Sequence, residues 1–184
     1  FFYPPSCLIC ENACDGEKAV CSSCHAMISD AVLAFDPPRR SMNTIDDIVV
    51  LLPYDLNCRK LVHAFKYHGL PSVATMAGNL MARKALPRLA SFSDAPLVPV
   101  PLHPEKLRQR GYNQCLRIAE GFSSFSGHVI REDLIERVVY TGTQTALDAA
   151  ERKQNVRGAF RFIGETSLAG KPVILLDDVM TTGS

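Results

Sequence analysis

The sequence has no long apolar segment. Its longest apolar clusters cover residues 48–52 and 173–176, whereas a membrane-spanning helix needs about 18 or more consecutive apolar residues. A transmembrane helix is therefore excluded, and we expect a water-soluble protein without membrane insertion. Internal repeats and low-complexity segments are also missing, and 47% hydrophobic with 21% charged residues excludes a disordered or collagen-like chain. The 184 residues fit one ordinary domain with a small additional unit.

Both ends of the sequence lack the usual signals. The chain begins at Phe1 rather than Met and stops at Ser184, directly after a Thr-Thr-Gly turn signal. We interpret both ends as trimmed, so a targeting sequence would not be visible and the last domain would be incomplete at its C-terminus.

Acidic residues are absent from residues 56–93, which contain six basic residues. The formal net charge of +1 hides this asymmetry, because residues 1–55 carry 8 acidic and 3 basic residues while residues 56–184 carry 11 and 17. Two interpretations of the basic stretch stay open: it binds an anionic partner, or it is a solvated surface.

Two Cys-x-x-Cys motifs lie near the start of the chain, Cys7 with Cys10 and Cys21 with Cys24. Their spacing is typical of a zinc site in which two tight turns present four thiolates. The alternatives are a redox motif, which would need only one pair, and a disulfide framework, which an intracellular compartment disfavours. We therefore predict a structural Zn²⁺ ion held by these four cysteines.

The other three cysteines have different expected roles. Cys14 lies between the two motifs and His25 directly after them, so either residue could replace a ligand. Cys58 and Cys115 are isolated, and we expect both to be small buried apolar residues.

A domain boundary is expected at the Pro-Pro-Arg-Arg run that ends at Arg40. Apolar residues at helical spacing from Cys24 to Phe35 predict a short helix before it, so residues 1–40 are predicted to form the zinc-binding unit. A metal would stabilise this unit, because about 40 residues bury too little apolar surface to fold unaided.

Strand-like and helix-like segments alternate in residues 41–184, which we assign to a second domain. Such alternation predicts an α/β fold with a mostly parallel sheet flanked by helices on both faces. The expected strands cover residues 45–52, 97–102, 134–140, 159–163 and 173–176, and the expected helices cover residues 59–67 or begin at Ser72 and Asn113.

An acidic pair and a hydroxyl-rich turn follow the last expected strand. Open α/β sheets bind ligands at the carboxyl ends of their strands, and backbone N–H groups of such a turn suit a phosphate, aided by the helix expected to follow. Carboxylates repel a phosphate, so sugar hydroxyls or a cation are their expected partners. A phosphorylated ribose offers both features. The pair is Asp177 and Asp178, and the turn contains Thr181, Thr182, Gly183 and Ser184.

This segment resembles the phosphoribosyl pyrophosphate (PRPP) motif of type I phosphoribosyltransferases. The whole chain is similar to the ComF/GntX family of competence-associated, phosphoribosyltransferase-like proteins, which carry an N-terminal four-cysteine zinc motif. The matching segments, in family order, are the two cysteine motifs, Phe65-Lys66-Tyr67-His68-Gly69, Val98-Pro-Val-Pro-Leu-His103 with Arg110-Gly-Tyr-Asn-Gln114, Gln144 with Arg152, Asn155 and Gly158-Ala-Phe160, and the PRPP motif.

The resemblance implies two further parts of a PRPP site. The first is a pyrophosphate loop, and its basic residues, its glycine and its helix-opening asparagine also suit an anion by themselves, although a charged surface loop is the alternative. The second is a mobile loop that closes over the ligand, with an ordinary connecting loop as the alternative. The pyrophosphate loop contains Arg110, Gly111, Tyr112 and Asn113, and the mobile loop contains Gln144, Arg152 and Asn155.

The implied reaction displaces Mg²⁺-bound pyrophosphate from C1 of PRPP through an oxocarbenium-like centre. Asp177 and Asp178 would hold the ribose hydroxyls, and residues 181–184 would hold the 5-phosphate. His63 and His68 are weak candidates for a general base, so the catalytic residues stay unassigned. The sequence identifies neither the acceptor substrate nor the oligomeric state.

Two functions are consistent with the sequence. The first is a phosphoribosyltransferase that acts on an unknown acceptor. The second is a non-catalytic factor that binds single-stranded DNA through the basic stretch and retains a vestigial or regulatory PRPP pocket. The resemblance associates either function with DNA uptake, natural transformation and other competence proteins, and it implies a cytoplasmic location.

Overall fold

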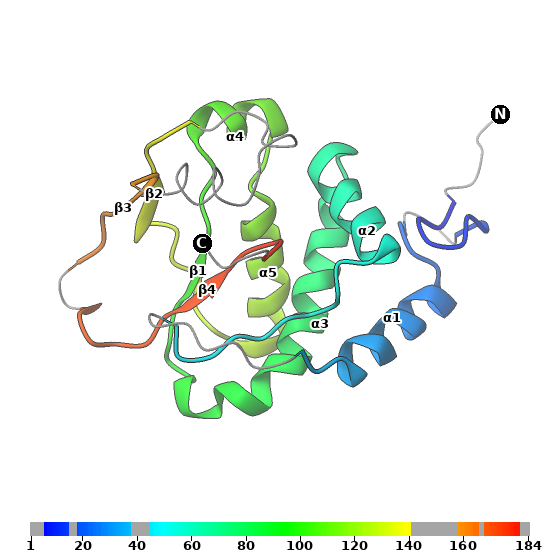
Figure 1. Cartoon of the computed structure of the whole chain (residues 1–184), viewed down its shortest axis with the longest axis horizontal. Coiled ribbons are helices and arrows are strands. Elements are labelled where there is room, and N and C mark those ends of the chain that lie inside the picture. Colours follow the sequence, from blue (N-terminus) through cyan, green and yellow to red (C-terminus); the bar gives the residue numbers. More distant parts are fainter. Residues whose placement is uncertain (1–5, 15–17, 38–44, 141–157, 166–167, 181–184) are drawn as a thin grey trace.

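The computed structural model describes residues 6–14, 18–37, 45–140, 158–165 and 168–180 of the chain. Helices and small sheets make the fold α/β, as the sequence predicts (Figure 1). None of the described helices is both long and apolar enough to cross a membrane. The helices are α1 (Ser22–Ala34), α2 (Leu56–Tyr67), α3 (Pro71–Leu89), the 3-10 helix η1 (Ala90–Phe92), α4 (Pro104–Arg110) and α5 (Gln114–Ser126). The strands are β1 (Leu97–Pro99), β2 (Ile135–Arg137), β3 (Phe160–Phe162) and β4 (Ile174–Leu176).

Helices α3 and α5 form the centre of the molecule and pack closely against each other (Figure 1). Two glycines permit this approach: a Cβ atom on Gly78 would lie 2.0 Å from the carbonyl oxygen of Ile118, and one on Gly121 would lie 2.0 Å from that of Thr75. Any larger residue would therefore push the two backbones apart. Phe122, one residue after the second glycine, is fully buried at the same contact.

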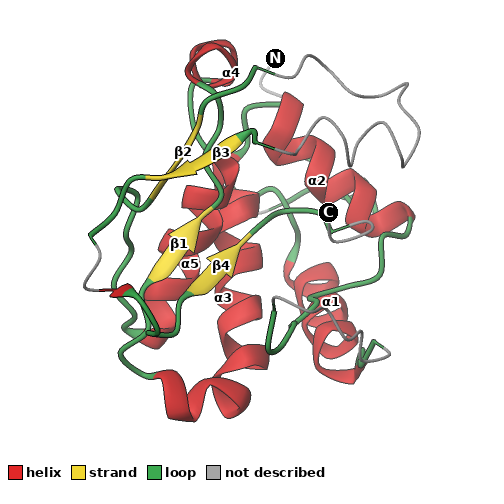
Figure 2. Cartoon of the chain, turned by 60° about the vertical axis from the view of Figure 1, so that its left-hand side comes forward, coloured by secondary structure: helices red, strands yellow, loops and turns green. Residues whose placement is uncertain are grey.

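Strands β1 and β4 pair in parallel and lie against α5 (Figure 2). Leu97 pairs with Ile174, and both Leu97 and Leu176 are buried in the cluster that includes α5. Leu175 is 56% exposed and Val173 is 50% exposed. The expectation that helices cover both faces of this strand is therefore wrong at its outer face.

The predicted sheet is smaller in the structure than the sequence suggests. Strands β2 and β3 form a separate antiparallel pair, with Glu136 opposite Arg161. The expected strand at residues 45–52 is wrong, because this segment forms no strand. Its apolar side chains Val49, Leu51 and Leu52 instead pack against the two hydrophobic clusters, which satisfies their hydrophobicity without a neighbouring strand.

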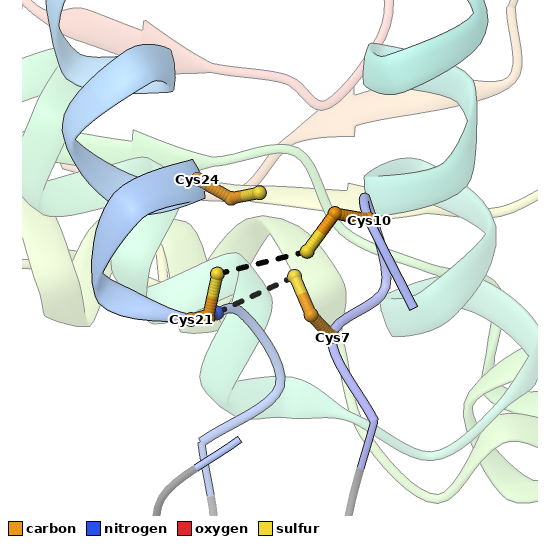
Figure 3. Close-up of side chains that lie close together, drawn as sticks. All are labelled: Cys7, Cys10, Cys21 and Cys24. Carbon is orange, nitrogen blue, oxygen red and sulfur yellow. Dashed lines mark hydrogen bonds between the residues drawn. The ribbon is translucent and has the colours of Figure 1, made fainter. Parts of the chain in front are cut away.

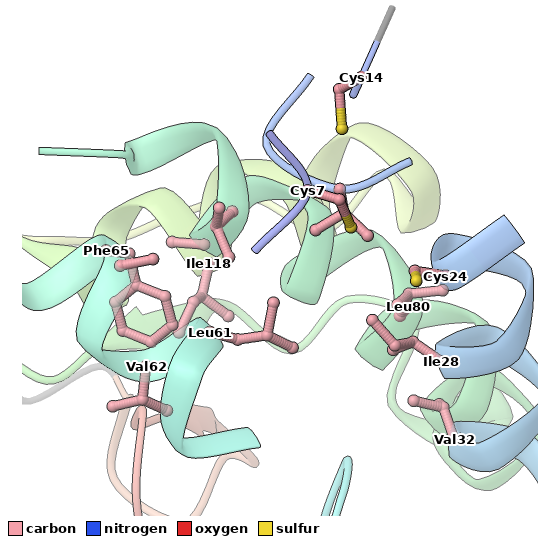
Figure 4. Packing of buried hydrophobic residues seen from close by; sticks show 14 residues of the cluster. Cys7, Cys14, Cys24, Ile28, Val32, Leu61, Val62, Phe65, Leu80 and Ile118 are labelled. Carbon is pink, nitrogen blue, oxygen red and sulfur yellow. The ribbon is translucent and has the colours of Figure 1, made fainter. Parts of the chain in front are cut away.

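The cysteine-containing segment shares its hydrophobic core with the rest of the chain. Cys24, Ile28 and Val32 of α1 lie in one cluster with residues of α2, α3 and α5 (Figure 4). Lys84 of α3 donates a hydrogen bond of 2.9 Å to the carbonyl oxygen of Val32, which caps the last turn of α1. The domain boundary predicted at Arg40 lies outside the described residues.

The crossing of α3 and α5 gives a test of the packing. We expect Gly121→Ala to lower the free energy of unfolding by about 2 kcal/mol, because the new methyl group meets the backbone of Thr75. Urea denaturation measures the change, with Asp30→Ala on the exposed side of α1 as control. Alanine is the better helix former, so an unchanged or raised stability would show that intrinsic helix propensity dominates and would contradict the close crossing.

Candidate functional site

The acidic pair lies where β4 ends. Strand β1 ends beside β4, and the chain beyond it stays close, because the N–H of Val100 donates a hydrogen bond of 2.9 Å to the carbonyl oxygen of Leu176. The N–H of Asp178 donates to Oδ1 of Asp177 at 2.8 Å, so the two carboxylates share one turn. The carboxyl end of a parallel strand pair is thus occupied by two adjacent acids, which is the position where α/β sheets bind ligands.

Asp178 forms a largely buried ion pair with Lys66 of α2. The Nζ atom of Lys66 lies 2.8 Å from Oδ1 of Asp178, and the two side chains are 19% and 7% exposed. The other oxygen of Asp178, Oδ2, is buried and has no hydrogen-bond partner among the described residues. A buried acceptor of this kind costs free energy until a donor reaches it.

Asp177 is the more accessible member of the pair. It is exposed as a whole residue, yet neighbouring atoms partly desolvate its carboxyl group. This desolvation, followed by repulsion from Asp178, raises the pKa of Asp177 above its usual value. A hydrogen-bond donor or a cation from a ligand would stabilise its charged form.

Three more cations surround the acidic pair. Burial lowers the pKa of Lys106, and the positive charges of Arg110, Arg137 and Lys66 lower it further, which means that these four groups lie near one another. Burial also lowers the pKa of Arg137, while the nearby charge of Asp177 opposes this shift. This cluster of charged side chains therefore combines two carboxylates with four cations from α2, α4 and β2.

The predicted pyrophosphate loop lies between α4 and α5. Gly111 ends α4 in the left-handed region, with φ of 83°, and Asn113 caps α5 by accepting a hydrogen bond of 3.0 Å from the N–H of Cys115. The amide nitrogen of Asn113 donates to the carbonyl oxygen of Val100 at 3.1 Å. These bonds fix the loop beside the end of β1.

The same loop holds the end of α2. The hydroxyl of Tyr112 donates to the carbonyl oxygen of Phe65, and the guanidinium of Arg110 lies 5.9 Å from the ring of Tyr67. Lys66 lies between these two contact points in the sequence. The loop therefore fixes the backbone position from which the Lys66 side chain extends.

Sequence reasoning missed Lys66 and Arg137 as members of this cluster of charged side chains. The sequence signal that marks Lys66 is the Phe65-Lys66-Tyr67-His68-Gly69 segment of the family resemblance. The weak general-base candidate His63 packs its ring against Tyr67, with centroids 5.3 Å apart. The predicted site residues Thr181, Thr182, Gly183, Ser184, Gln144, Arg152 and Asn155 lie outside the described residues.

Cys115 adds a thiol to the acidic end of this cluster. Its Sγ atom donates to Oδ1 of Asp177 at 3.6 Å, and its burial confirms the prediction of a small buried residue. Burial, followed by the charges of Asp178 and Asp177, raises the pKa of Cys115 well above its usual value. The Sγ atom of Cys115 and one carboxylate oxygen each of Asp177 and Asp178 lie within 4.8 Å of one another, and Lys66 offsets only one of the two negative charges.

The four cysteines of the two motifs form a separate cluster. Their sulfur atoms all lie within 4.8 Å of one another, and Cys14 and His25 are not part of this group (Figure 3). The Sγ atoms of Cys10 and Cys21 are 3.8 Å apart. A tetrahedral zinc site with Zn–S bonds of about 2.3 Å separates its sulfurs by about 3.8 Å. The cluster therefore fits a zinc ion.

The thiol pKa values show how the cluster favours a cation. Burial opposes ionisation of Cys7, but backbone hydrogen bonds at Cys10 and Cys21 outweigh it and lower the pKa of Cys7 to about 6. Burial, followed by hydrogen bonds with the neighbouring thiols, raises the pKa of Cys24 to about 12. Four thiolates cannot coexist here without a positive charge between them, and a bound Zn²⁺ would supply it.

The basic stretch at residues 56–93 is used largely for contacts within the chain. Five of its six cations have partners among the described residues. Lys60 donates to the carbonyl oxygen of Ile9, Lys66 pairs with Asp178, Arg83 stacks on Phe125, Lys84 donates to the end of α1, and Arg88 pairs with Asp47. Most cations of this stretch therefore stabilise contacts within the chain.

Comparisons with known proteins agree with the family resemblance. The chain is 27% identical to the DNA utilization protein YhgH of Escherichia coli K12 over 187 residues, which cover 97% of this chain and 79% of that protein. The YhgH protein of Salmonella typhi is 28% identical over the same length. Competence protein F of Haemophilus influenzae is 35% identical over 89 residues, or 48% of this chain and 39% of that protein. No family model and no solved structure matches the chain.

These matches confirm the resemblance of the chain to the ComF family. The alignment with the YhgH proteins runs over nearly the whole chain, so it includes both the cysteine cluster and the acidic pair. The chain is thus a ComF-like α/β protein with four clustered cysteines.

Metal analysis tests the cysteine cluster. We expect the purified protein to contain one zinc ion per chain and Cys24→Ser to lose it, because three thiolates leave the tetrahedral site incomplete. Elemental analysis measures the zinc, and thermal unfolding with and without a chelator measures the accompanying loss of stability. Cys14→Ala is the matched control and should retain the metal. Retention of full zinc by Cys24→Ser, or its loss in Cys14→Ala, would contradict the assignment.

Proposed function

We propose that the chain binds PRPP, as its Mg²⁺ complex, at the acidic pair, and that it is a phosphoribosyltransferase-like protein serving DNA uptake. The observation that carries the proposal is Asp178, whose carboxylate is buried beside Asp177 at the end of β4 and whose Oδ2 atom has no donor among the described residues. A ribose hydroxyl is a neutral donor of the required size. Two vicinal hydroxyls can be held by two adjacent carboxylates.

The charges around the pair suit the rest of the molecule. PRPP carries a pyrophosphate on C1, next to the ribose hydroxyls, and Lys106 lies near both Asp178 and Arg110. Mg²⁺ would enter with the pyrophosphate and offset part of its charge. Residues 181–184 are proposed to hold the 5-phosphate, and residues Gln144, Arg152 and Asn155 to close over the bound ligand.

The proposed reaction transfers the phosphoribosyl group to an acceptor. The bond between C1 and the pyrophosphate oxygen breaks, the pyrophosphate leaves with its electron pair, and the acceptor forms a new bond to C1. The protein positions the groups and stabilises the charge that collects on the leaving pyrophosphate. Lys106 and Arg110 are the side chains proposed for this stabilisation.

The role in DNA uptake is proposed from the relatives. The printed names of these relatives are DNA utilization protein and competence protein F. We infer that this chain serves the same process, in the cytoplasm and with other competence proteins as partners, and that the zinc-binding segment supports the fold. Its shared core with α2 and α3 favours this structural role over a separate DNA contact.

The second candidate is a non-catalytic protein that binds single-stranded DNA. The names of the relatives favour it, whereas the internal contacts of the basic stretch argue against the surface first proposed for it. We therefore place it after PRPP binding.

Ligand binding tests the first function. We expect PRPP with Mg²⁺ at about 100 times its Kd to raise the Tm of the protein by roughly 5–10 °C, because a ligand of the native state adds about 2.7 kcal/mol of stability. Asp177→Asn combined with Asp178→Asn should abolish the rise, since the ribose contacts are lost. Asp30→Asn on the exposed side of α1 is the control and should behave as wild type. An unchanged rise in the double variant would overturn the ribose assignment.

Titration with a labelled single-stranded oligonucleotide tests the second function. We expect Lys60→Glu combined with Arg83→Glu to leave any DNA affinity within about twofold of wild type, because both side chains already have partners in the chain. Fluorescence anisotropy at several salt concentrations measures it, and circular dichroism checks the fold. A loss of about tenfold with a shallower salt dependence would make DNA binding through this stretch the primary function.

A further inference from the structure

The Lys66–Asp178 ion pair joins two parts of the chain that lie 112 residues apart. Its two side chains are only 19% and 7% exposed, so both charges have lost most of their water. Partly buried ion pairs gain little net stability because desolvation offsets much of the attraction. The pair is therefore an expensive contact if its only purpose is to hold α2 against β4.

The cations beside the acidic pair favour a further anion. Lys66, Lys106 and Arg110 lie close enough to one another to interact electrostatically. Repulsion from the charge of Lys66 contributes to lowering the pKa of Lys106. An anion placed beside Lys106 would therefore attract the ammonium of Lys66 as well.

The backbone around Lys66 is held while its side chain can turn. Tyr112 fixes the carbonyl of Phe65, and Arg110 lies over the ring of Tyr67. The Lys66 side chain has four rotatable bonds and a single-point charge, so its ammonium can exchange one acceptor for another without moving α2. The contacts of Tyr112 and Arg110 thus fix the backbone position of Lys66. The acceptor that its ammonium group contacts can change when a ligand binds.

We propose that Lys66 is a specificity-determining residue that distinguishes PRPP from ribose 5-phosphate by contacting the pyrophosphate group on C1. In the structure its ammonium pairs with Asp178. When PRPP binds, a ribose hydroxyl donates to Asp178 and the ammonium of Lys66 also donates to the pyrophosphate. Ribose 5-phosphate lacks that group and leaves the original pair unchanged. This inference rests on the proposed function.

The test compares two ligands in matched variants. Isothermal titration calorimetry measures the Kd of PRPP and of ribose 5-phosphate, both with Mg²⁺, for wild type and Lys66→Gln. We expect Lys66→Gln to weaken PRPP binding about tenfold or more and ribose 5-phosphate less than threefold, since one charge-assisted hydrogen bond to the pyrophosphate is lost. Lys66→Arg keeps the charge and should restore most of the preference for PRPP.

Arg59→Gln is the control for loss of charge on the same helix. Arg59 is exposed, and its guanidinium has no partner in the part of the chain that the structure describes. It should bind both ligands as wild type does. Thermal unfolding of each variant without ligand shows whether the fold is retained.

The outcomes separate the inference from the function on which it rests. If wild type binds PRPP and Lys66→Gln weakens both ligands equally, Lys66 only positions Asp178 and the inference is wrong while the proposed function stands. If Lys66→Gln binds PRPP as wild type does, the inference is also wrong. If wild type shows no saturable PRPP binding, the proposed function itself fails.

Discussion

The close crossing of α3 and α5 is the constraint on which the rest of the structure depends. Gly78 and Gly121 bring the two backbones together, and α1, α2, η1, β1 and β4 each pack against one of these two helices. Strands β1 and β4 lie against α5, while α1 and α2 pack on α3 (Figure 2). The acidic pair at the end of β4 therefore contacts α2 because β4 packs on α5, α2 packs on α3, and these two helices cross closely.

The cluster of charged side chains that results is a balance between carboxylates and cations. Lys66 stabilises one oxygen of Asp178, and the other oxygen has no donor in the part of the chain that the structure describes. The loop at residues 110–113 joins the end of β1 to the end of α2 and sets the spacing of the charges. A ligand that carries both hydroxyls and phosphate groups would satisfy the acids and the cations together, and this combination is the basis of the proposed PRPP site.

The parts of the structure that the sequence predicts best are set by short-range patterns. Two Cys-x-x-Cys motifs bring four sulfurs together because each turn is local, and the asparagine at position 113 caps α5 because its side chain reaches only two residues ahead. The helix over residues 59–67 is confirmed within α2, which begins three residues earlier. Amphipathic spacing is enough to find such helices.

The parts that the sequence did not predict depend on distant contacts. The pairing of Lys66 with Asp178 spans 112 residues, and neither side chain indicates the other. The strand expected at residues 45–52 is wrong for the same reason: apolar β-branched residues predict burial, but only a neighbouring strand makes them a strand. The phosphate turn and the mobile loop lie outside the described residues and stay predictions.

The most direct test of the account is a crystal structure of the protein with PRPP and Mg²⁺. The account predicts a ribose hydroxyl within hydrogen-bond distance of Asp178 Oδ2 and the pyrophosphate beside Lys106 and Arg110. A ligand bound elsewhere on the molecule, with the acidic pair unchanged, would contradict it.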